Sequence, residues 1–371
     1  MNNVRHRLGA GIRLRTRHKL AALAMALLLH GCGSSSAPDS SGSYSPNAAS
    51  GGATGTPVVD SKGCTQYGDP PRAVATDSLD GTLNDWLTAL TNVCTFNGGT
   101  MLDDYTDSSG SPRRACMIAP NKASGPLPML VYVHPTLLGE DSVVLTGLLS
   151  LVNSANLSGN SGKPGFVLLI PLGRNIQQFL PFPLNTGVGW DHWYRNTDRS
   201  SPYLNPDFAT LDHYIAEVKS KGIVDSSRVY VTGWSEGADF GTLYGLNTPG
   251  VAATGVFSTV SPFDDSADPC PGPAFASNNT RPYYLMVREC DIGGACDGGQ
   301  TFLGQLRGGV MQSSLVQGVI LNALTQPVQA CNESCAPGTT GGTLLGQLQH
   351  IQWPEPWNDN LMQFMEQNPQ P

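Results

Sequence analysis

The sequence predicts an α/β protein in which a mostly parallel sheet carries helices on both faces. Five short apolar runs indicate buried strands, and segments of helical periodicity and turns bound them along the chain. Continuous apolar strands need cover on both faces, so this pattern is typical of a parallel sheet between helix layers. In such sheets the functional residues lie beyond the carboxyl ends of the strands. The residues that follow each run are therefore the first candidates for function.

The predicted elements follow one another from residue 80 to the end of the chain. Apolar residues at helical spacing predict helices at 80–93, 208–218 and 358–365. The apolar runs predict strands at 129–133, 165–170, 228–232, within 251–260, and at 283–287. Residues 60–371 are therefore expected to form one folded domain.

The first 31 residues are typical of a bacterial lipoprotein signal peptide. Residues 1–19 carry six basic residues and no acid, and residues 20–29 form an apolar run too short to span a bilayer as a helix. Gly31 precedes Cys32, the residue expected to carry the lipid. Residues 32–59 are rich in Ser, Gly, Ala and Pro, which is typical of a flexible tether. We expect export and anchoring through Cys32, with plain secretion after cleavage near the same place as the alternative.

The charge of the exported chain limits its partners. Six of the 21 basic residues lie in the signal peptide, which leaves 15 against 29 acidic residues, a net charge of −14. An acidic surface repels nucleic acid and anionic lipid headgroups. We therefore expect no nucleic-acid partner, and membrane contact only through the lipid anchor.

The cysteines other than Cys32 are even in number, which predicts disulfides in an exported chain. Three precede residue 120 and five follow residue 269, so complete pairing requires at least one bridge between these two parts. Zinc is disfavoured because the spacing Cys331-x3-Cys335 has no matching Cys or His pair, and we expect neither a metal nor another cofactor. The eight cysteines are Cys64, Cys94, Cys116, Cys270, Cys290, Cys296, Cys331 and Cys335.

The predicted strand at 228–232 is followed by Gly-Trp-Ser-Glu-Gly and then by a helix-like segment. A G-x-S-x-G motif between a strand and a helix indicates the nucleophile elbow of the α/β-hydrolase fold, in which a sharp turn exposes the serine hydroxyl. Ser235 is thus the predicted nucleophile, and the backbone N–H of Glu236 is a predicted oxyanion donor. The second donor is expected after the strand at 129–133. Pro135 has no N–H there, so Thr136 is the candidate.

A serine nucleophile needs a base, and in this fold the chain order is serine, acid, histidine. His350 is the only histidine after Ser235, in a segment expected to be a loop before the last helix. Asp291 follows the strand at 283–287 and is predicted to orient the imidazole. The alternatives for the acid are Asp297 and Glu289 nearby, and Asp264 or Asp265 after the preceding strand.

Aromatic residues gather in 179–183 and 189–194, and another precedes the nucleophile. Exposed aromatic side chains could stack on a hydrophobic polyester or an aromatic acyl group. Clustered tryptophans and tyrosines also pack well in a protein core, which is the alternative. The candidate substrate-binding residues are Trp190, Trp193 and Trp234.

Ten residues in 225–237 match a motif of one enzyme group: Asp225, Ser227, Arg228, Val229, Tyr230, Val231, Thr232, Gly233, Ser235 and Gly237. Trp353 and Pro354 also follow His350 closely. In these features the chain resembles the extracellular polyhydroxybutyrate depolymerase and feruloyl or acetylxylan esterase group of the α/β-hydrolase superfamily, over about residues 125–365. It departs from that group at Pro135, at Ala238 and in the residues just before Asp291.

The motif and the resemblance together imply a secreted serine carboxylic-ester hydrolase that works through an acyl-enzyme. Its expected substrate is a polyester of the polyhydroxyalkanoate kind or a plant-polysaccharide acyl ester. A serine exopeptidase is the alternative enzyme, although such enzymes usually carry a large extra domain and this chain leaves little room for one. A catalytically inactive surface-binding lipoprotein on the same fold is the alternative from another class.

Overall fold

The computed structural model describes residues 89–370 apart from several short gaps, which lie at 109, 122–124, 137–138, 178–185, 192–193, 195–196, 198, 201, 203–204, 264–280, 309–311 and 336–342. The predicted signal peptide, the tether and the lipidation site Cys32 therefore lie outside the described residues. The same holds for Cys64 and Cys270. Within the described residues, no helix combines the length and the apolar character needed to cross a bilayer.

The core of the molecule is a twisted sheet that has nine strands within the described residues, in the order β1-β2-β4-β3-β7-β8-β9-β10-β11. The strands from β4 to β10 in this order run parallel, while β1, β2 and β11 are added antiparallel at the two edges. A separate antiparallel pair is formed by β5 (Arg174–Gln177) and β6 (Thr186–Gly189). The strands of the main sheet are β1 (Thr100–Thr106), β2 (Pro112–Ile118), β3 (Leu127–Val133), β4 (Val167–Pro171), β7 (Val224–Trp234), β8 (Ala253–Phe257), β9 (Tyr283–Arg288), β10 (Val316–Leu321) and β11 (Pro327–Val328).

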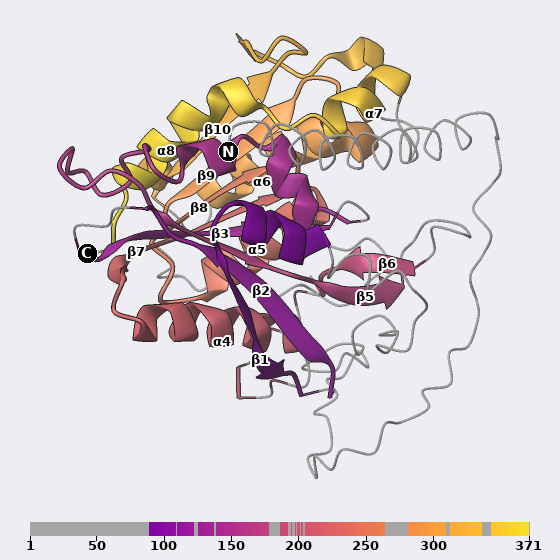
Figure 1. Ribbon diagram of the computed structural model, residues 1–371. Coiled ribbons are helices and arrows are strands. Elements are labelled where there is room, and N and C mark those ends of the chain that lie inside the picture. The colour runs from indigo at the N-terminus through magenta and orange to yellow at the C-terminus, as the bar shows by residue number, and fades with distance from the viewer. Residues whose placement is uncertain are drawn as a thin grey trace, which may run out of the picture.

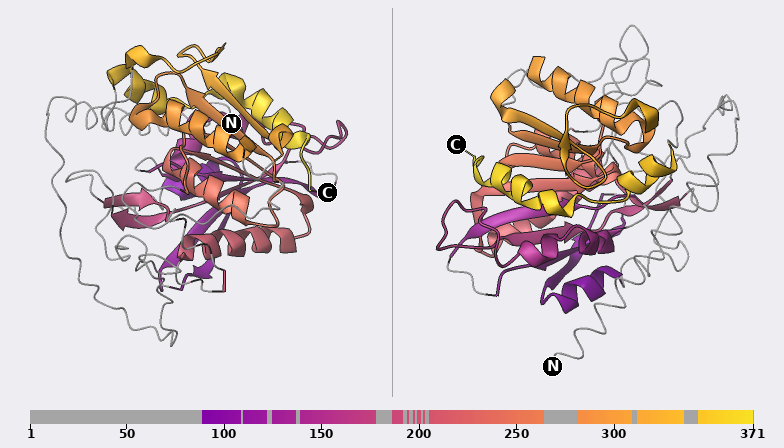
Figure 2. Two further views of the ribbon diagram at one scale, coloured as in Figure 1. Left: turned by 180° about the vertical axis from the view of Figure 1, so that it is seen from behind. Right: turned by 90° about the horizontal axis from the view of Figure 1, so that it is seen from above.

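Helices cover both faces of this sheet (Figures 1 and 2). Alternate strand residues point to opposite faces. In β3, Met129 and Val131 pack with the helices α4 and α5, while Leu130 and Tyr132 pack with α8. Helix α6 extends the α4–α5 layer over β9 and β10, and α3 joins α8 on the other face. The helices are α3 (Leu148–Leu151), α4 (Pro206–Ser220), α5 (Glu236–Asn247), α6 (Ala295–Gly308), α7 (Leu344–His350) and α8 (Asn358–Glu366), with short 3-10 turns η1 (Glu140–Leu145), η2 (Ile292–Gly294), η3 (Ser313–Leu315), η4 (Glu333–Cys335) and η5 (Glu355–Trp357).

This architecture confirms the predicted fold class. The mostly parallel sheet, the helices on both faces and the strand–turn–helix at Ser235 are those of an α/β-hydrolase fold. The five predicted strands correspond to β3, β4, β7, β8 and β9, and two predicted helices correspond to α4 and α8. The described end of the predicted helix at 80–93 is helical from residue 89 to 96.

The glycine-rich segment after Asp291 forms the turn η2, which helix α6 follows directly. One local prediction was wrong. His350 does not lie in a loop but is the last residue of helix α7, which begins after Thr343. The Thr343 side chain accepts a hydrogen bond from the Gly346 N–H and so caps this helix.

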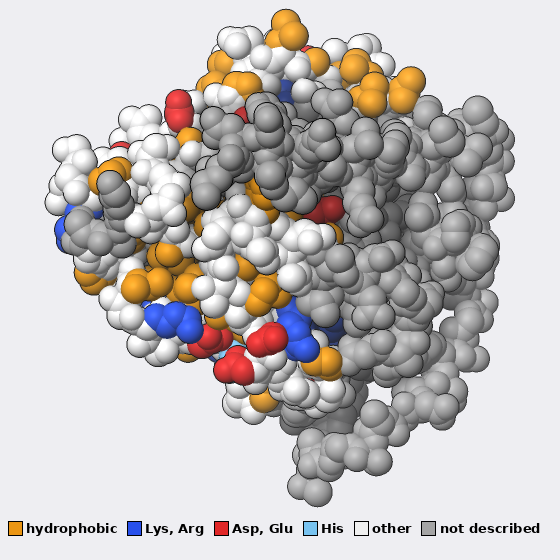
Figure 3. Space-filling view, viewed as in Figure 1, with side chains coloured by type: hydrophobic (Ala, Val, Ile, Leu, Met, Phe, Trp, Pro, Cys, Tyr) orange, Lys and Arg blue, Asp and Glu red, His pale blue; other side chains and the backbone are white. Residues whose placement is uncertain are grey.

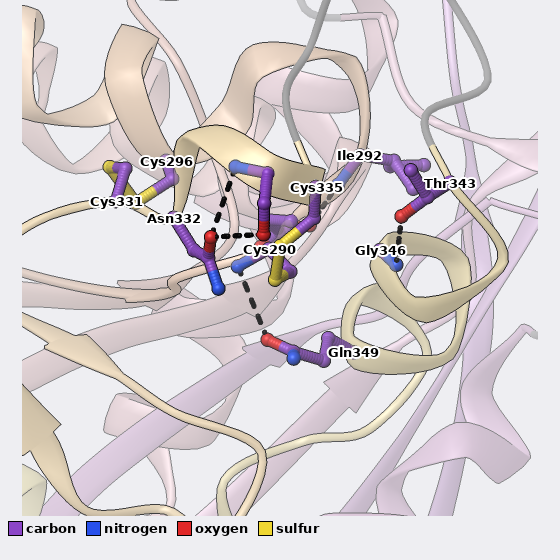
Figure 4. Close-up of a disulfide and its surroundings, with 11 residues drawn as sticks. Cys290, Ile292, Cys296, Cys331, Asn332, Cys335, Thr343, Gly346 and Gln349 are labelled. Atoms are coloured by element: carbon purple, nitrogen blue, oxygen red, sulfur yellow. Dashed lines mark hydrogen bonds between the residues drawn. A yellow bond between two sulfur atoms is a disulfide. The ribbon is translucent and has the colours of Figure 1, made fainter.

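Three disulfides join the described cysteines. Cys94–Cys116 ties the helical segment at 89–96 to β2. Cys290–Cys335 and Cys296–Cys331 both connect the segment around Asp291 with the segment that leads to α7 (Figure 4). Cys290 and Cys296 therefore do not pair with each other but with cysteines of the later segment.

Candidate active site

Ser235 occupies a sharp turn between β7 and α5. Its φ of 57° and ψ of −126° lie in a region that non-glycine residues rarely adopt. The flanking glycines are required by close backbone approach. A Cβ at Gly233 would lie 2.1 Å from the Gly237 carbonyl oxygen, and one at Gly237 would lie 2.3 Å from the His134 carbonyl oxygen. The motif therefore specifies a backbone shape that larger residues would prevent.

The three residues predicted as a triad form one hydrogen-bonded series. Ser235 Oγ lies 2.8 Å from His350 Nε2, and His350 Nδ1 lies 2.7 Å from Asp291 Oδ1. The Asp291 side chain is fully buried, whereas the His350 side chain keeps 14% of its surface exposed. A carboxylate accepts hydrogen bonds but has none to donate, so the proton of a neutral imidazole belongs on Nδ1. Nε2 is then free to accept the hydroxyl proton of Ser235.

The competing acids lie elsewhere or outside the described residues. Asp297 is exposed in the first turn of α6, and Glu289 is partly exposed at the end of β9. Asp264 and Asp265 fall in the gap at 264–280. Asp291 also accepts the Ile292 N–H on the same oxygen, at 2.9 Å, which holds its carboxylate in place.

The two predicted oxyanion residues lie side by side. Glu236 is the first residue of α5, so its N–H belongs to the helix N-terminus, where the helix dipole favours negative charge. The Thr136 hydroxyl donates to the Glu236 carboxylate and thereby joins the loop after β3 to the elbow.

The His134 side chain is neutral and fully buried, and its hydrogen bonds support the loop after β3. Burial lowers its pKa from 6.5 to about 4. The Gly173 N–H donates to Nε2 at 2.9 Å, so the ring proton lies on Nδ1 and is donated to the Pro135 carbonyl oxygen at 3.0 Å. Trp190 Nε1 in turn donates to the His134 carbonyl oxygen at 2.9 Å.

For two of the candidate substrate-binding tryptophans, the structure favours the core-packing alternative. The Trp190 and Trp234 side chains are each only 1% exposed. Trp190 stacks on Phe240 with ring centres 5.1 Å apart, and Trp234 Nε1 donates to the His350 carbonyl oxygen at 2.9 Å. They therefore brace the site instead of offering a surface to substrate. Trp193 lies outside the described residues.

A buried ionic network fixes the segment that carries Trp190. Asp207, at the start of α4, binds Arg113 at 2.6 Å and Arg174 at 3.2 Å, and also accepts the Asp191 N–H at 2.7 Å. Arg113 binds Asp107 as well, at 2.9 Å. Burial of Asp207 disfavours its charged form, but the neighbouring Arg174 and Arg113 outweigh this and hold its pKa below the ordinary value.

Helix α7, which carries His350, has an inverted pattern of burial. Gln347 and Gln349 are 3% and 2% exposed, and a Cβ at Gly346 would lie 2.5 Å from the Cys290 carbonyl oxygen. The leucines instead face solvent, and hydrophobic side chains are visible over this helix in Figure 3. The exposed leucines are Leu344 (50%), Leu345 (47%) and Leu348 (46%). Polar groups and a glycine thus form the contact between α7 and the Asp291 segment.

One residue near the triad was not predicted. Ser258 follows β8 directly, and its Oγ lies 2.8 Å from His350 Nδ1. A serine after a strand is an ordinary feature of a sequence. The position of Ser258 after a strand is the one feature of the sequence that could have indicated it. Strand β8, like β7 and β9, ends at the edge of the sheet where the triad lies.

Among the described residues, Asp104, His213 and Glu217 form a group that could in principle hold a metal ion. They lie on β1 and α4, away from the elements of the triad, and Asp104 is exposed. Lys221 binds Glu217 at 2.9 Å and so occupies one of the carboxylates. Exposed groups of this kind are common without an ion, so we assign no metal role to them.

No protein-family model and no curated protein sequence matches the chain. Similar solved structures include an S-formylglutathione hydrolase from Agrobacterium tumefaciens (TM-score 0.47, 12% identity, 73% of this chain and 96% of that one). Others are an esterase from Pyrobaculum calidifontis (0.45, 14%, 78% and 94%) and a thermostable esterase (0.45, 15%, 73% and 63%). The match thus spans less than two thirds of the thermostable esterase. At these identities and TM-scores, the likeness does not assign an activity to this chain.

Proposed function

We propose that the protein is a serine hydrolase that cleaves carboxylic esters. The observation that carries this proposal is the hydrogen-bonded series Asp291–His350–Ser235, which ends on a hydroxyl at a strained strand-to-helix turn. Nucleophile, base and orienting acid in hydrogen-bond reach are the signature of nucleophilic catalysis.

In the proposed reaction, Ser235 Oγ attacks the ester carbonyl carbon while His350 Nε2 takes the hydroxyl proton. The backbone amides of Glu236 and Thr136 stabilise the negative charge that develops on the carbonyl oxygen. His350 then returns the proton to the departing alcohol, which leaves an acyl group on Ser235. Water, activated by the same imidazole, hydrolyses this acyl-enzyme and restores the serine.

Asp291 keeps the ring proton on Nδ1 and stabilises the imidazolium that forms during each proton transfer. Its complete burial strengthens this interaction because a low local dielectric screens charge poorly. The oxygen that contacts the ring also accepts the Ile292 N–H, so the carboxylate is oriented before substrate binds.

The proposed substrate is a polyester of the polyhydroxyalkanoate kind or an acyl ester of a plant polysaccharide. Support comes from the resemblance of 225–237 and of the segment after His350 to the depolymerase and esterase group. A panel of p-nitrophenyl acyl esters, methyl ferulate, acetylated xylan and short-chain polyhydroxyalkanoate film separates these substrates. Peptide p-nitroanilides in the same panel test the alternative of a serine exopeptidase.

The decisive variant for this proposal is Ser235→Ala. Its rate of ester hydrolysis should fall by about 10⁴-fold or more, because the bond-forming oxygen is removed. Thermal unfolding should show that the variant is folded. Ser227→Ala, on the same strand with a hydroxyl bonded to Asp225, is the matched control and should keep the parental rate. A Ser235→Ala rate within about tenfold of the parent would contradict the assignment.

We also propose that the protein is exported and anchored to the bacterial envelope through Cys32. The apolar run at 20–29 followed by Gly31-Cys32 supports this, and three disulfides are compatible with an oxidising compartment. Replacement of Cys32 by Ser should move the protein from the membrane fraction to the soluble fraction. If the variant still partitions into detergent as the parent does, the anchor lies elsewhere.

A further inference from the structure

Ser235 and Ser258 occupy equivalent places on neighbouring parallel strands. In the pairing of β7 with β8, Trp234 lies opposite Phe257, so each serine is the first residue beyond its strand. The Ser235 N–H donates to the Phe257 carbonyl oxygen at 3.0 Å, and the Ser258 N–H donates to the Met286 carbonyl oxygen at 2.9 Å. The strand ladders therefore fix both serine backbones.

The imidazole of His350 lies between these two hydroxyls. Ser235 Oγ is 2.8 Å from Nε2, and Ser258 Oγ is 2.8 Å from Nδ1. Asp291 Oδ1, 2.7 Å from the same Nδ1, completes the set of contacts. The Nδ1 proton is thus shared between a carboxylate oxygen and a hydroxyl oxygen, both of which accept.

The backbone at Ser258 indicates that its side chain is used. Its φ is 64°, a left-handed conformation that glycine adopts without steric cost. Serine is strained there, and strain of this kind gathers at functional sites. Ser258 is 3% exposed, so water does not compete for its hydroxyl.

The Asp291 carboxylate holds the ring through one oxygen only. Within the described residues its second oxygen, Oδ2, is buried and has no hydrogen-bond partner. A carboxylate supported in this way limits rotation of the imidazole less well than one bonded through both oxygens. A second acceptor on Nδ1, presented from a different strand, fixes the plane of the ring.

We propose that Ser258 is a positioning residue for the catalytic base: its hydroxyl accepts the Nδ1 proton together with Asp291 and holds the imidazole in line with Ser235. This inference rests on the proposed function, because it assigns a role within the same site. Ser258 acts through His350 and does not touch the substrate.

The first test compares Ser258→Ala and Ser258→Gly with the parent on a soluble p-nitrophenyl ester. Both variants remove the hydroxyl, and glycine also removes the strain. Loss of one hydrogen bond to the ring should lower kcat by about fivefold in both and leave KM within about twofold. Ser261→Ala, in the same loop, is the matched control and should keep the parental kcat. Parental kcat in both Ser258 variants would overturn the proposal.

The second test removes the other partner of Nδ1. In an Asp291→Ala background, Ser258 is the remaining acceptor that the proposal assigns to this proton. Adding Ser258→Ala should then lower the residual kcat by a further factor of about ten. A double variant as active as Asp291→Ala alone would contradict the shared hydrogen bond.

The third test separates positioning from a merely structural role. Ser258→Asp combined with Asp291→Ala places a carboxylate at the end of β8, at a backbone conformation that aspartate tolerates. It should recover activity by about tenfold over Asp291→Ala alone. No recovery in a variant with a parental unfolding temperature would overturn the proposal. If instead Ser235→Ala keeps activity, the proposed function itself fails, whatever the Ser258 variants do.

Discussion

The proposed nucleophile elbow at Ser235 and the proposed acid–base pair, Asp291 and His350, meet at one edge of the sheet but are held there by different means. The elbow joins two long elements, β7 and α5, and packs against β3 and β8 in the middle of the sheet. Its shape depends on close contacts between backbone atoms at Gly233 and Gly237. Neither of the two disulfides near the site, Cys290–Cys335 and Cys296–Cys331, joins the elbow to another segment.

Asp291 and His350 lie on short elements toward the other side of the site. Asp291 precedes the three-residue turn η2, and His350 ends the seven-residue helix α7. Two disulfides tie the Asp291 segment to the chain that leads into α7 (Figure 4). The Cys290 N–H also donates to Gln349 Oε1 at 3.3 Å, one residue before the proposed base His350.

The side chains of the two regions are thus positioned in two different ways. A residue between long packed elements is placed by the core, whereas residues on short segments need added constraints. Low pH should therefore destabilise the elbow region through protonation of the buried His134. Loss of the disulfides should loosen the positioning of Asp291 and His350. The predictions below test each side of this contrast.

The largest expected effect within the acid–base region is that of Asp291→Asn. It should lower kcat by about 10⁴-fold, because an amide does not enforce the Nδ1 proton or stabilise the imidazolium. Asp297→Asn is the matched control and should keep the parental kcat, because that side chain is exposed on α6. Steady-state kinetics of the two variants tests whether Asp291 is the acid of the triad. If Asp297→Asn is the more damaging change, the acid is misassigned.

The stability of the elbow region should fall at low pH because of His134. The folded-state pKa of His134 is lowered from 6.5 to about 4 by burial, so the unfolded chain binds this proton first as pH falls. Stability is therefore present above pH 6.5 and is lost as pH falls toward 4, by about 3 kcal/mol in the free energy of unfolding.

Urea unfolding of the parent and of His134→Gln across this pH range isolates the contribution of His134. The glutamine amide oxygen can still accept the Gly173 N–H but does not titrate. The variant should start less stable at pH 7 and lose less stability on acidification. Parallel stability curves for the two proteins would exclude a role for His134 in this pH dependence.

The smallest expected effect is that of removing a disulfide beside the acid. Cys290→Ala/Cys335→Ala should lower kcat by about tenfold through a looser fit between Asp291 and His350, while the sheet stays folded. Cys94→Ala/Cys116→Ala is the control. It removes a buried disulfide far along the chain from the site and should lower stability with kcat retained.

A dithiothreitol series on the parent provides a second readout of the same contrast. Activity should fall before the fluorescence of Trp190 changes, because this side chain is buried in the core against Phe240 of α5. Equal kcat losses in both cysteine double variants, or activity that survives full reduction, would show that the disulfides do not position the acid.

The same contrast explains what the sequence could predict. The elbow and the central strands follow from local patterns, namely a five-residue motif and apolar runs, so the fold class was predicted correctly. The edge strand β1 was missed because it is largely exposed and polar. Helix α7 was missed because its leucines face solvent and its glutamines are buried, which inverts the usual pattern.

Within the candidate site, long-range contacts limited the prediction. Position after a strand favoured Asp291 but left four other acids open, because the choice depends on which carboxylate reaches His350 in space. The pairing of eight cysteines does not follow from their spacing. Ser258 depends on the register between β7 and β8, which no local pattern encodes.

The central claim is that Ser235 is an activated nucleophile, and covalent labelling with a fluorophosphonate tests it most directly. The parent should gain one adduct by intact mass, and peptide mapping should place it on Ser235. The label should be absent from Ser235→Ala and much slower to form in Asp291→Asn. A folded parent that takes no label, or a label on another serine, would contradict the account.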